Sequence, residues 1–126
     1  MTLATSLVFS GCGGRDADVP ARYRNLAVPA ERLASNAARA HGRALFLEHC
    51  AICHGVNADG HGIRAEGLSP SPVDFTNPGW RESVGPRRVF SWIREGVPGT
   101  AMPSWDILDD RQTWDLVAYL LSVGKS

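Results

Sequence analysis

Residues 50–54 of the 126-residue chain read Cys50-Ala51-Ile52-Cys53-His54, and the predicted fold follows from this motif. Two thiols separated by two residues can both reach one edge of a porphyrin when they lie on one helical turn. A histidine directly after the second cysteine can then ligate a central iron. A CxxCH sequence is the signature of covalent haem c attachment. The motif therefore predicts a fold built around one covalently bound haem.

Other uses of a cysteine pair fit this chain less well. A structural zinc site takes four ligands, and beyond the pair the chain offers only Cys12 and scattered histidines. A thioredoxin-like redox pair belongs in a βαβ unit, and no strand pattern is present. A disulfide between Cys50 and Cys53 would leave His54 unexplained. Haem attachment uses all three residues of the motif.

The haem iron needs a sixth ligand from the protein or keeps an open position. The chain has two methionines, Met1 and Met102. Met102 lies in a loop rich in proline and glycine, and Pro103 biases its backbone towards an extended conformation. A lone methionine is commonly flexible core filler, but together with CxxCH we expect Met102 to bind the iron. His61 is the alternative axial ligand, whereas His41 and His49 are expected to be surface or packing residues.

The residues before the motif predict a helix that begins at Ser35 or Asn36 and runs to Cys50. Either residue can cap a helix start. Gly42, Phe46 and Cys50 are four residues apart, so they share one face of this helix. A glycine on that face suits the close passage of another helix.

Two further helices are expected after the motif. One covers residues 87–95, with Pro86 in its first turn and Gly96 at its C-terminal cap. The other covers residues 110–123. Pro70, Pro72 and Pro78 predict an irregular stretch before them. The predicted fold class is therefore all-α, with three main helices and long loops wrapped around the haem.

Further residues are candidates for contacts around the haem. The ring N–H of a ligating histidine usually donates to a carbonyl or carboxylate, and Pro70 or Pro72 could supply that carbonyl. The other candidates, for the haem propionates or for packing on the ring, are Arg64, Trp80, Arg81 and Trp105.

These motifs resemble the class I monohaem c-type cytochromes over residues 35–126. The resemblance rests on Gly42-x3-Phe46-x3-Cys50, on CxxCH followed by glycine, on residues 99–105 and on the aromatic last helix. It implies one haem bound through His54 and Met102. It also implies that the first and last helices cross near the haem, where Gly42 and Phe46 meet Tyr119.

The resemblance implies one-electron transfer between two redox proteins, a donor and an acceptor, with iron cycling between Fe(II) and Fe(III). Histidine–methionine ligation raises the potential relative to an all-histidine site. Two alternatives remain open. An open-site haem peroxidase or gas sensor would require that Met102 does not bind. A cytochrome subunit of a larger oxidoreductase complex would use the same site.

The N-terminal residues indicate export. Residues 1–11 are apolar or small and uncharged, as in the tail of a secretory signal. Phe9-Ser10-Gly11-Cys12 resembles a bacterial lipoprotein processing site, in which Cys12 would carry a lipid. The alternative is a disordered N-terminus in which this cysteine has no role. Residues 12–34 are predicted to form a flexible tether, with packing on the domain as the alternative, and residues 35–126 to form the domain. We therefore expect a periplasmic or extracytoplasmic protein held at a membrane through Cys12.

The charge composition limits the kinds of partner that the chain is expected to bind. Thirteen basic and thirteen acidic residues give a formal net charge of zero, which argues against a nucleic-acid binder. Locally, residues 15–43 are basic, and acidic residues gather late in the chain. Either group could steer a redox partner. The acidic residues are Asp106, Asp109, Asp110 and Asp115.

Overall fold

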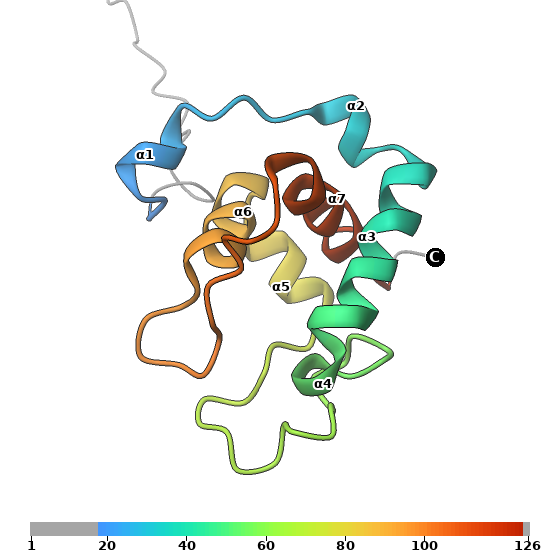
Figure 1. The fold of residues 1–126 in the computed structure, drawn as a ribbon, viewed down its shortest axis with the longest axis vertical. Helices are drawn as coiled ribbons and strands as arrows, with labels where there is room; N and C mark the ends of the chain where they lie inside the picture. The colour runs from blue at the N-terminus through green and yellow to red at the C-terminus, as the bar shows by residue number, and fades with distance from the viewer. Residues whose placement is uncertain (1–17, 125–126) are drawn as a thin grey trace, which may run out of the picture.

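The computed structural model describes residues 18–124, and all regular structure in this range is helical. Figure 1 shows the helices gathered above two long loops. The three longest are the three predicted ones, so the all-α prediction is confirmed. In chain order the helices are α1 (Ala21–Arg24), α2 (Ala30–Leu33), α3 (Asn36–His49), α4 (Ala51–His54), α5 (Pro78–Ser83), α6 (Pro86–Glu95) and α7 (Asp110–Leu120).

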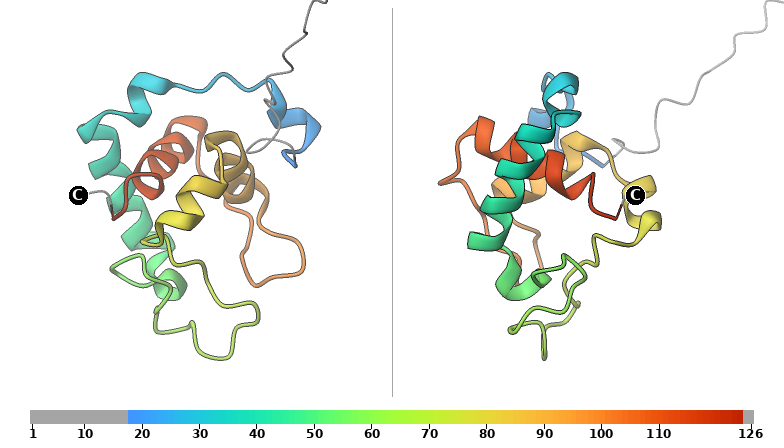
Figure 2. Two further views of the ribbon diagram at one scale, coloured as in Figure 1. Left: turned by 180° about the vertical axis from the view of Figure 1, so that it is seen from behind. Right: turned by 90° about the vertical axis from the view of Figure 1, so that its right-hand side faces the viewer.

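Helices α3 and α7 cross closely, side by side in both views of Figure 2. Ser35 caps α3 by accepting a hydrogen bond from the Ala38 amide at 3.3 Å. At the crossing, a Cβ on Gly42 would lie 1.9 Å from the carbonyl oxygen of Asp115 and 2.9 Å from Tyr119 Cβ. Phe46 packs on Tyr119 with ring centroids 5.2 Å apart. Only glycine permits this approach, as the family resemblance implied.

Helix α7 begins at a capping box. The Asp109 side chain accepts from the Gln112 amide at 2.7 Å, and the Gln112 side chain accepts from the Asp109 amide at 3.0 Å. The helix ends at Leu120, three residues before the predicted end, and residues 121–124 form turns. Its apolar side chains enter a core shared with α3 and α6, where Phe90 packs on Trp114 at 4.5 Å between ring centroids.

The N-terminal segment corrects one prediction. Residues 18–34 were expected to belong to a flexible tether, but they pack along the helices as an arm that contains α1 and α2 (Figure 1). Val19 is fully buried, and the Tyr23 hydroxyl donates to Glu95 at 3.0 Å. The arm's apolar residues lack helical periodicity, yet they pack against the core. Residues 1–17, including Cys12, lie outside the described range.

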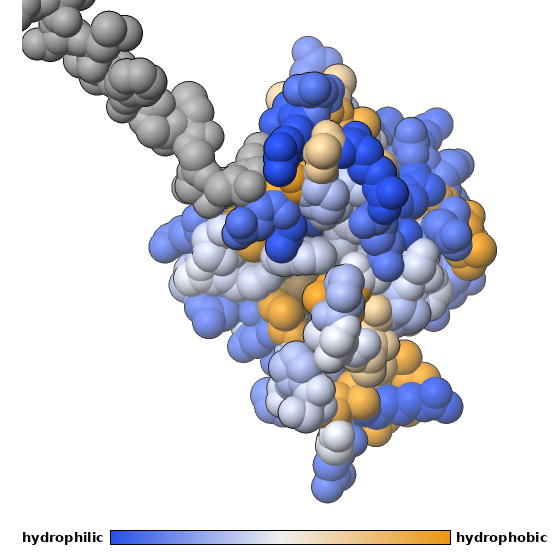
Figure 3. All heavy atoms as spheres, turned by 90° about the vertical axis from the view of Figure 1, so that its left-hand side faces the viewer, coloured by the Kyte–Doolittle hydropathy of each residue, from blue (hydrophilic) through white to orange (hydrophobic). Residues whose placement is uncertain are grey.

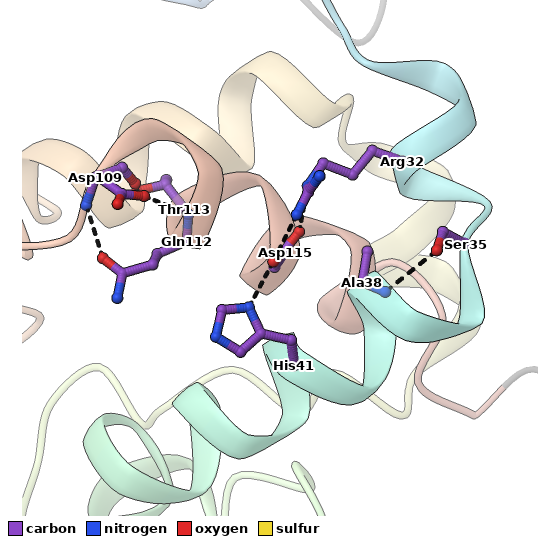
Figure 4. Close-up of polar contacts among 8 residues, drawn as sticks. All are labelled: Arg32, Ser35, Ala38, His41, Asp109, Gln112, Thr113 and Asp115. Carbon is purple, nitrogen blue, oxygen red and sulfur yellow. Dashed lines mark hydrogen bonds and ion pairs between the residues drawn. The ribbon is translucent and has the colours of Figure 1, made fainter.

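Asp115 ties this arm to the crossing of α3 and α7 (Figure 4). Arg32 on α2 donates to both carboxylate oxygens, at 2.5 and 3.1 Å, and His41 Nδ1 lies 2.6 Å from one of them. Burial disfavours the charged carboxylate, but the hydrogen bonds from Arg32 and His41 outweigh it and lower the pKa of Asp115. Asp115 is fully buried, so its predicted place in an exposed acidic patch is wrong.

The chain between α4 and α6 is organised by backbone hydrogen bonds. The amides of Gly60 and Gly62 donate to the carbonyls of His54 and Cys53, at 2.8 and 3.1 Å. The expected irregular stretch ends in α5, where Pro78 occupies the first turn and Asn77 caps the Gly79 amide at 2.9 Å. Within residues 18–124, no helix is long and apolar enough to cross a membrane.

Candidate haem site

The CxxCH motif forms one tight turn at the end of α3. The Cys50 amide donates to the Phe46 carbonyl at 2.8 Å, and the amides of Cys53 and His54 both donate to the Cys50 carbonyl, at 3.2 and 3.0 Å. Three residues of helical turn bring Cys50 and Cys53 to the same side, and both thiols are free. Burial, with a smaller contribution from Cys53, raises the pKa of Cys50 to about 12. We call residues 50–54 the attachment turn.

His54 is held from one side by the backbone. Its Nδ1 lies 3.2 Å from the Val73 carbonyl oxygen, an acceptor that fixes Nδ1 as the protonated nitrogen and leaves the Nε2 lone pair available to a metal. The ring packs on Phe75 at 4.6 Å between centroids. Burial lowers the pKa of His54, against a smaller opposing effect of the Val73 carbonyl. The imidazole is thus kept neutral and oriented, as a metal ligand requires.

The carbonyl that anchors His54 is not one of the two predicted. We expected Pro70 or Pro72 to supply this carbonyl, and that expectation is wrong, because the carbonyl belongs to Val73. The Phe75 amide donates to the Ala58 carbonyl at 2.8 Å, which draws residues 73–75 against the loop that follows His54. Phe75 was missed as a site residue, and its only signal was that it is the lone aromatic in a proline-rich stretch.

Met102 lies in the loop between α6 and α7. Gly96 ends α6 with φ of +76°, and a Cβ there would lie 2.8 Å from the Met102 carbonyl oxygen. The Met102 amide donates to Thr100 Oγ1 at 3.1 Å, so this part of the loop is held by an internal hydrogen bond. Trp105 packs on His49, with 5.2 Å between ring centroids. Because His49 directly precedes Cys50, this contact brings the methionine loop beside the attachment turn.

The remaining predicted contact residues have other partners or lie exposed. Trp80 packs edge-on against Phe75 at 4.8 Å between centroids. Arg81 donates to the carbonyls of Phe75 and Val123, at 3.3 and 2.5 Å, and so anchors the end of the described chain. Arg64 is exposed on the loop. The His61 side chain is 86% exposed.

These residues fit a covalently attached haem. The attachment turn offers two reduced thiols and an imidazole with one nitrogen anchored, and aromatic rings back that imidazole. On the face in Figure 3, hydrophobic side chains gather in the middle and lower parts, as a largely apolar macrocycle requires. Zinc fits less well, because residues 18–124 contain no group of three or more histidine, cysteine, aspartate or glutamate side chains placed to hold a metal ion.

Comparison with known proteins agrees with this chemistry. A family model described as cytochrome c matches residues 39–124. The chain is 35% identical over 80 residues to a cytochrome c55X of Stutzerimonas stutzeri, in a match that covers 61% of this chain and 57% of that protein. The chain therefore matches a little over half the length of this relative.

Solved structures show the same fold. A chain of a reducing HAO-like protein complex of Kuenenia stuttgartiensis is 29% identical, with a TM-score of 0.58 over 66% of this chain and 41% of that chain. The KustC0563 c-type cytochrome is 27% identical, with a TM-score of 0.54 over 67% of this chain and 98% of that one. Because the family model covers most of the chain and the fold agrees, this protein belongs to the cytochrome c family, whose members bind haem c covalently.

Proposed function

We propose that this cytochrome transfers single electrons between two redox proteins, with haem c attached through Cys50 and Cys53 and ligated by His54 and Met102. The attachment turn carries the proposal, because it combines two free thiols with a histidine whose Nδ1 is already anchored on Val73. When bound, the haem supplies a one-electron couple between Fe(II) and Fe(III). The chain's own residues position that group, would ligate its iron and limit its contact with water.

His54 and Phe75 have distinct tasks in this proposal. The Val73 carbonyl fixes the imidazole plane, so the ligating nitrogen does not reorient when the iron changes charge. Phe75 and Phe46 pack around the His54 ring, at 4.6 and 6.3 Å between centroids, and shield part of it from water. A ligand that is fixed and partly shielded reorganises little during electron transfer.

The loop geometry favours Met102 over His61 as the sixth ligand. The amides on either side of His61 donate to the carbonyls of His54 and Cys53. His61 is therefore tied to the His54 side of the site. Met102 belongs to a separate loop with an internal hydrogen bond, and this loop reaches the attachment turn through the Trp105–His49 contact.

The attachment is tested by intact mass of protein expressed with its natural export machinery. Cys50→Ser and Cys53→Ser should each leave one thioether bond, and the double variant should lose the covalent haem. Ile52→Ser is the matched control, because Ile52 lies between the two cysteines and is 43% exposed. A double variant that keeps haem through acid–acetone extraction would contradict the proposal.

A second candidate is that the domain serves as an electron-transfer subunit of a larger oxidoreductase complex. The observation in its favour is the similarity to one chain of the Kuenenia stuttgartiensis complex. The two candidates share the same haem site. They differ in whether the protein is free or bound in a complex with an enzyme. Size measurement of the native protein in mild detergent separates them, since a free carrier should elute as a small protein and a subunit should co-elute with an enzyme.

We also propose that the protein works outside the cytoplasm and carries a lipid on Cys12. The small residues before Cys12 and the covalent haem both support export. The same intact-mass measurement detects a lipid, because the lipid adds a mass of its own to that of the haem. Cys12→Ser should remove that increment and release the protein from the membrane fraction without loss of colour.

A further inference from the structure

The packed arm sharply shortens the spacer between Cys12 and the folded domain. Residues 18–34 belong to the fold, so only the residues between Cys12 and Asp18 remain to span any gap. A fully extended chain covers about 3.5 Å per residue, which gives this spacer a reach of about 20 Å. If Cys12 carries the proposed lipid, the face of the domain at Asp18 must lie close to the membrane surface.

That face is basic. Residues 18–24 and 86–95 together contain five arginines and two carboxylates, Asp18 and Glu95. One of the five, Arg94, pairs with Asp110 of α7, which leaves four arginines on this face. Arg88 donates to the Asp18 carbonyl, and Arg87 donates to the Leu26 carbonyl at 2.8 Å. These contacts place the first turn of α6 beside α1. We call Arg22, Arg24, Arg87 and Arg88 the α1/α6 arginine face.

Part of this charge is open to solvent. The Arg22 side chain is 69% exposed, although it pairs with Glu95. Arg24 is exposed, and its Nε donates to the Val19 carbonyl at 2.9 Å. In Figure 3, which views the molecule from the side of α1, strongly hydrophilic side chains cover the upper part of the face. Guanidinium groups bind phosphate oxygens in pairs of parallel hydrogen bonds, so this surface suits phosphodiester groups.

The opposite end of the molecule has the opposite charge. The loop of residues 55–77 carries Asp59, Glu66 and Asp74 against a single arginine. This loop follows the attachment turn and lies at the far end of the long axis from the arm (Figure 1). The zero net charge therefore conceals a charge separation between the α1/α6 arginine face and the end that carries the attachment turn.

We propose that the α1/α6 arginine face rests on anionic phospholipid headgroups and turns the attachment turn away from the membrane, towards redox partners. The closeness of this face to the membrane rests on the proposed lipid at Cys12, whereas the charge of the face does not. An arginine near an anionic lipid surface strengthens binding about fivefold. The attraction is electrostatic, so salt should weaken it.

The test uses haem-loaded full-length protein with Cys12→Ser, so that no lipid contributes to binding. Co-sedimentation should show binding to vesicles of mixed phosphatidylglycerol and phosphatidylcholine at low salt, and little binding to pure phosphatidylcholine. Arg22→Gln with Arg24→Gln should weaken the binding about 25-fold, at about fivefold per arginine. Arg43→Gln with Arg64→Gln is the matched control, because both arginines are exposed and lie outside this face.

Equal binding to both kinds of vesicle, or an equal loss in the control variant, would overturn the arginine face as a lipid contact. So would an unchanged affinity in the α1 double variant that keeps its native circular dichroism. The lipid is judged separately, by the intact mass of the natural protein. A protein without lipid that still binds the anionic vesicles would refute the Cys12 proposal alone.

Discussion

Replacing Gly42 with alanine should destabilise the protein, even though alanine is the better helix former. The added Cβ would lie 1.9 Å from the Asp115 carbonyl oxygen, where ordinary contact begins near 3.4 Å. Helices α3 and α7 must therefore move apart by about 1.5 Å, the difference of those two distances. The clashing atom belongs to the backbone of a buried helix, so it cannot rotate away.

The size of the effect follows from two opposing terms. Overpacking a well-packed core costs about 1–3 kcal/mol, and a rigid backbone clash at the principal helix crossing belongs at the upper end. The better helix propensity of alanine returns about 1 kcal/mol. The expected net loss is about 2 kcal/mol, which corresponds to a fall in Tm of about 9 °C for a domain of this size.

Guanidinium unfolding of the haem-loaded protein, followed by far-ultraviolet circular dichroism, measures this loss. Ala44→Gly is the matched control, because Ala44 is exposed on the same helix and reports helix propensity without a clash. The control should lose about 1 kcal/mol. A Gly42→Ala protein as stable as the wild type, or more stable, would refute the close crossing of α3 and α7.

Two further predictions concern the buried carboxylate and the methionine. Asp115→Asn should cost about 3 kcal/mol at neutral pH, because Arg32 loses its partner. The pKa of Asp115 is lowered in the folded state, so its stabilisation is present above the ordinary aspartate pKa near 4 and is lost as the pH falls through the folded-state pKa. The stability gap between wild type and variant should therefore shrink in acid, and a constant gap in denaturation curves from pH 7 to 3 would contradict the ion pair. Met102→Ala should lower the reduction potential in a redox titration, abolish the near-infrared methionine–iron band and allow the ferrous protein to bind carbon monoxide. The control Ala101→Ser should change none of these three properties. An unchanged potential in Met102→Ala would exclude Met102 as the ligand.

Local chemistry made part of this molecule predictable. Capping residues and proline and glycine positions mark helix ends, so Ser35, Pro86 and Gly96 predicted α3 and α6 within a residue or two. The attachment turn could be recognised as easily, because its two cysteines and its histidine lie within five consecutive residues. The structure places them on one turn, as the spacing required.

The features that the sequence could not predict depend on contacts between distant segments. Asp115 stands between Trp114 and Leu116 in the sequence, and only the fold brings Arg32 and His41 to it. The anchor of His54 is a backbone carbonyl, which every residue possesses, so no residue type could single out Val73. The arm's apolar residues follow no helical period, because they pack as an extended segment with two short turns of helix.

The sharing of Asp115 between the arm and α3 also defines the smallest unit that can fold alone. A protein cut at residue 35, the boundary that the sequence suggests, would lose Arg32 and keep a buried carboxylate with His41 as its remaining side-chain partner. It would also uncover the core surface against which Tyr23 and Leu33 pack. The autonomous folding unit therefore includes the arm, and any fusion or truncation of this cytochrome should join the chain before Asp18.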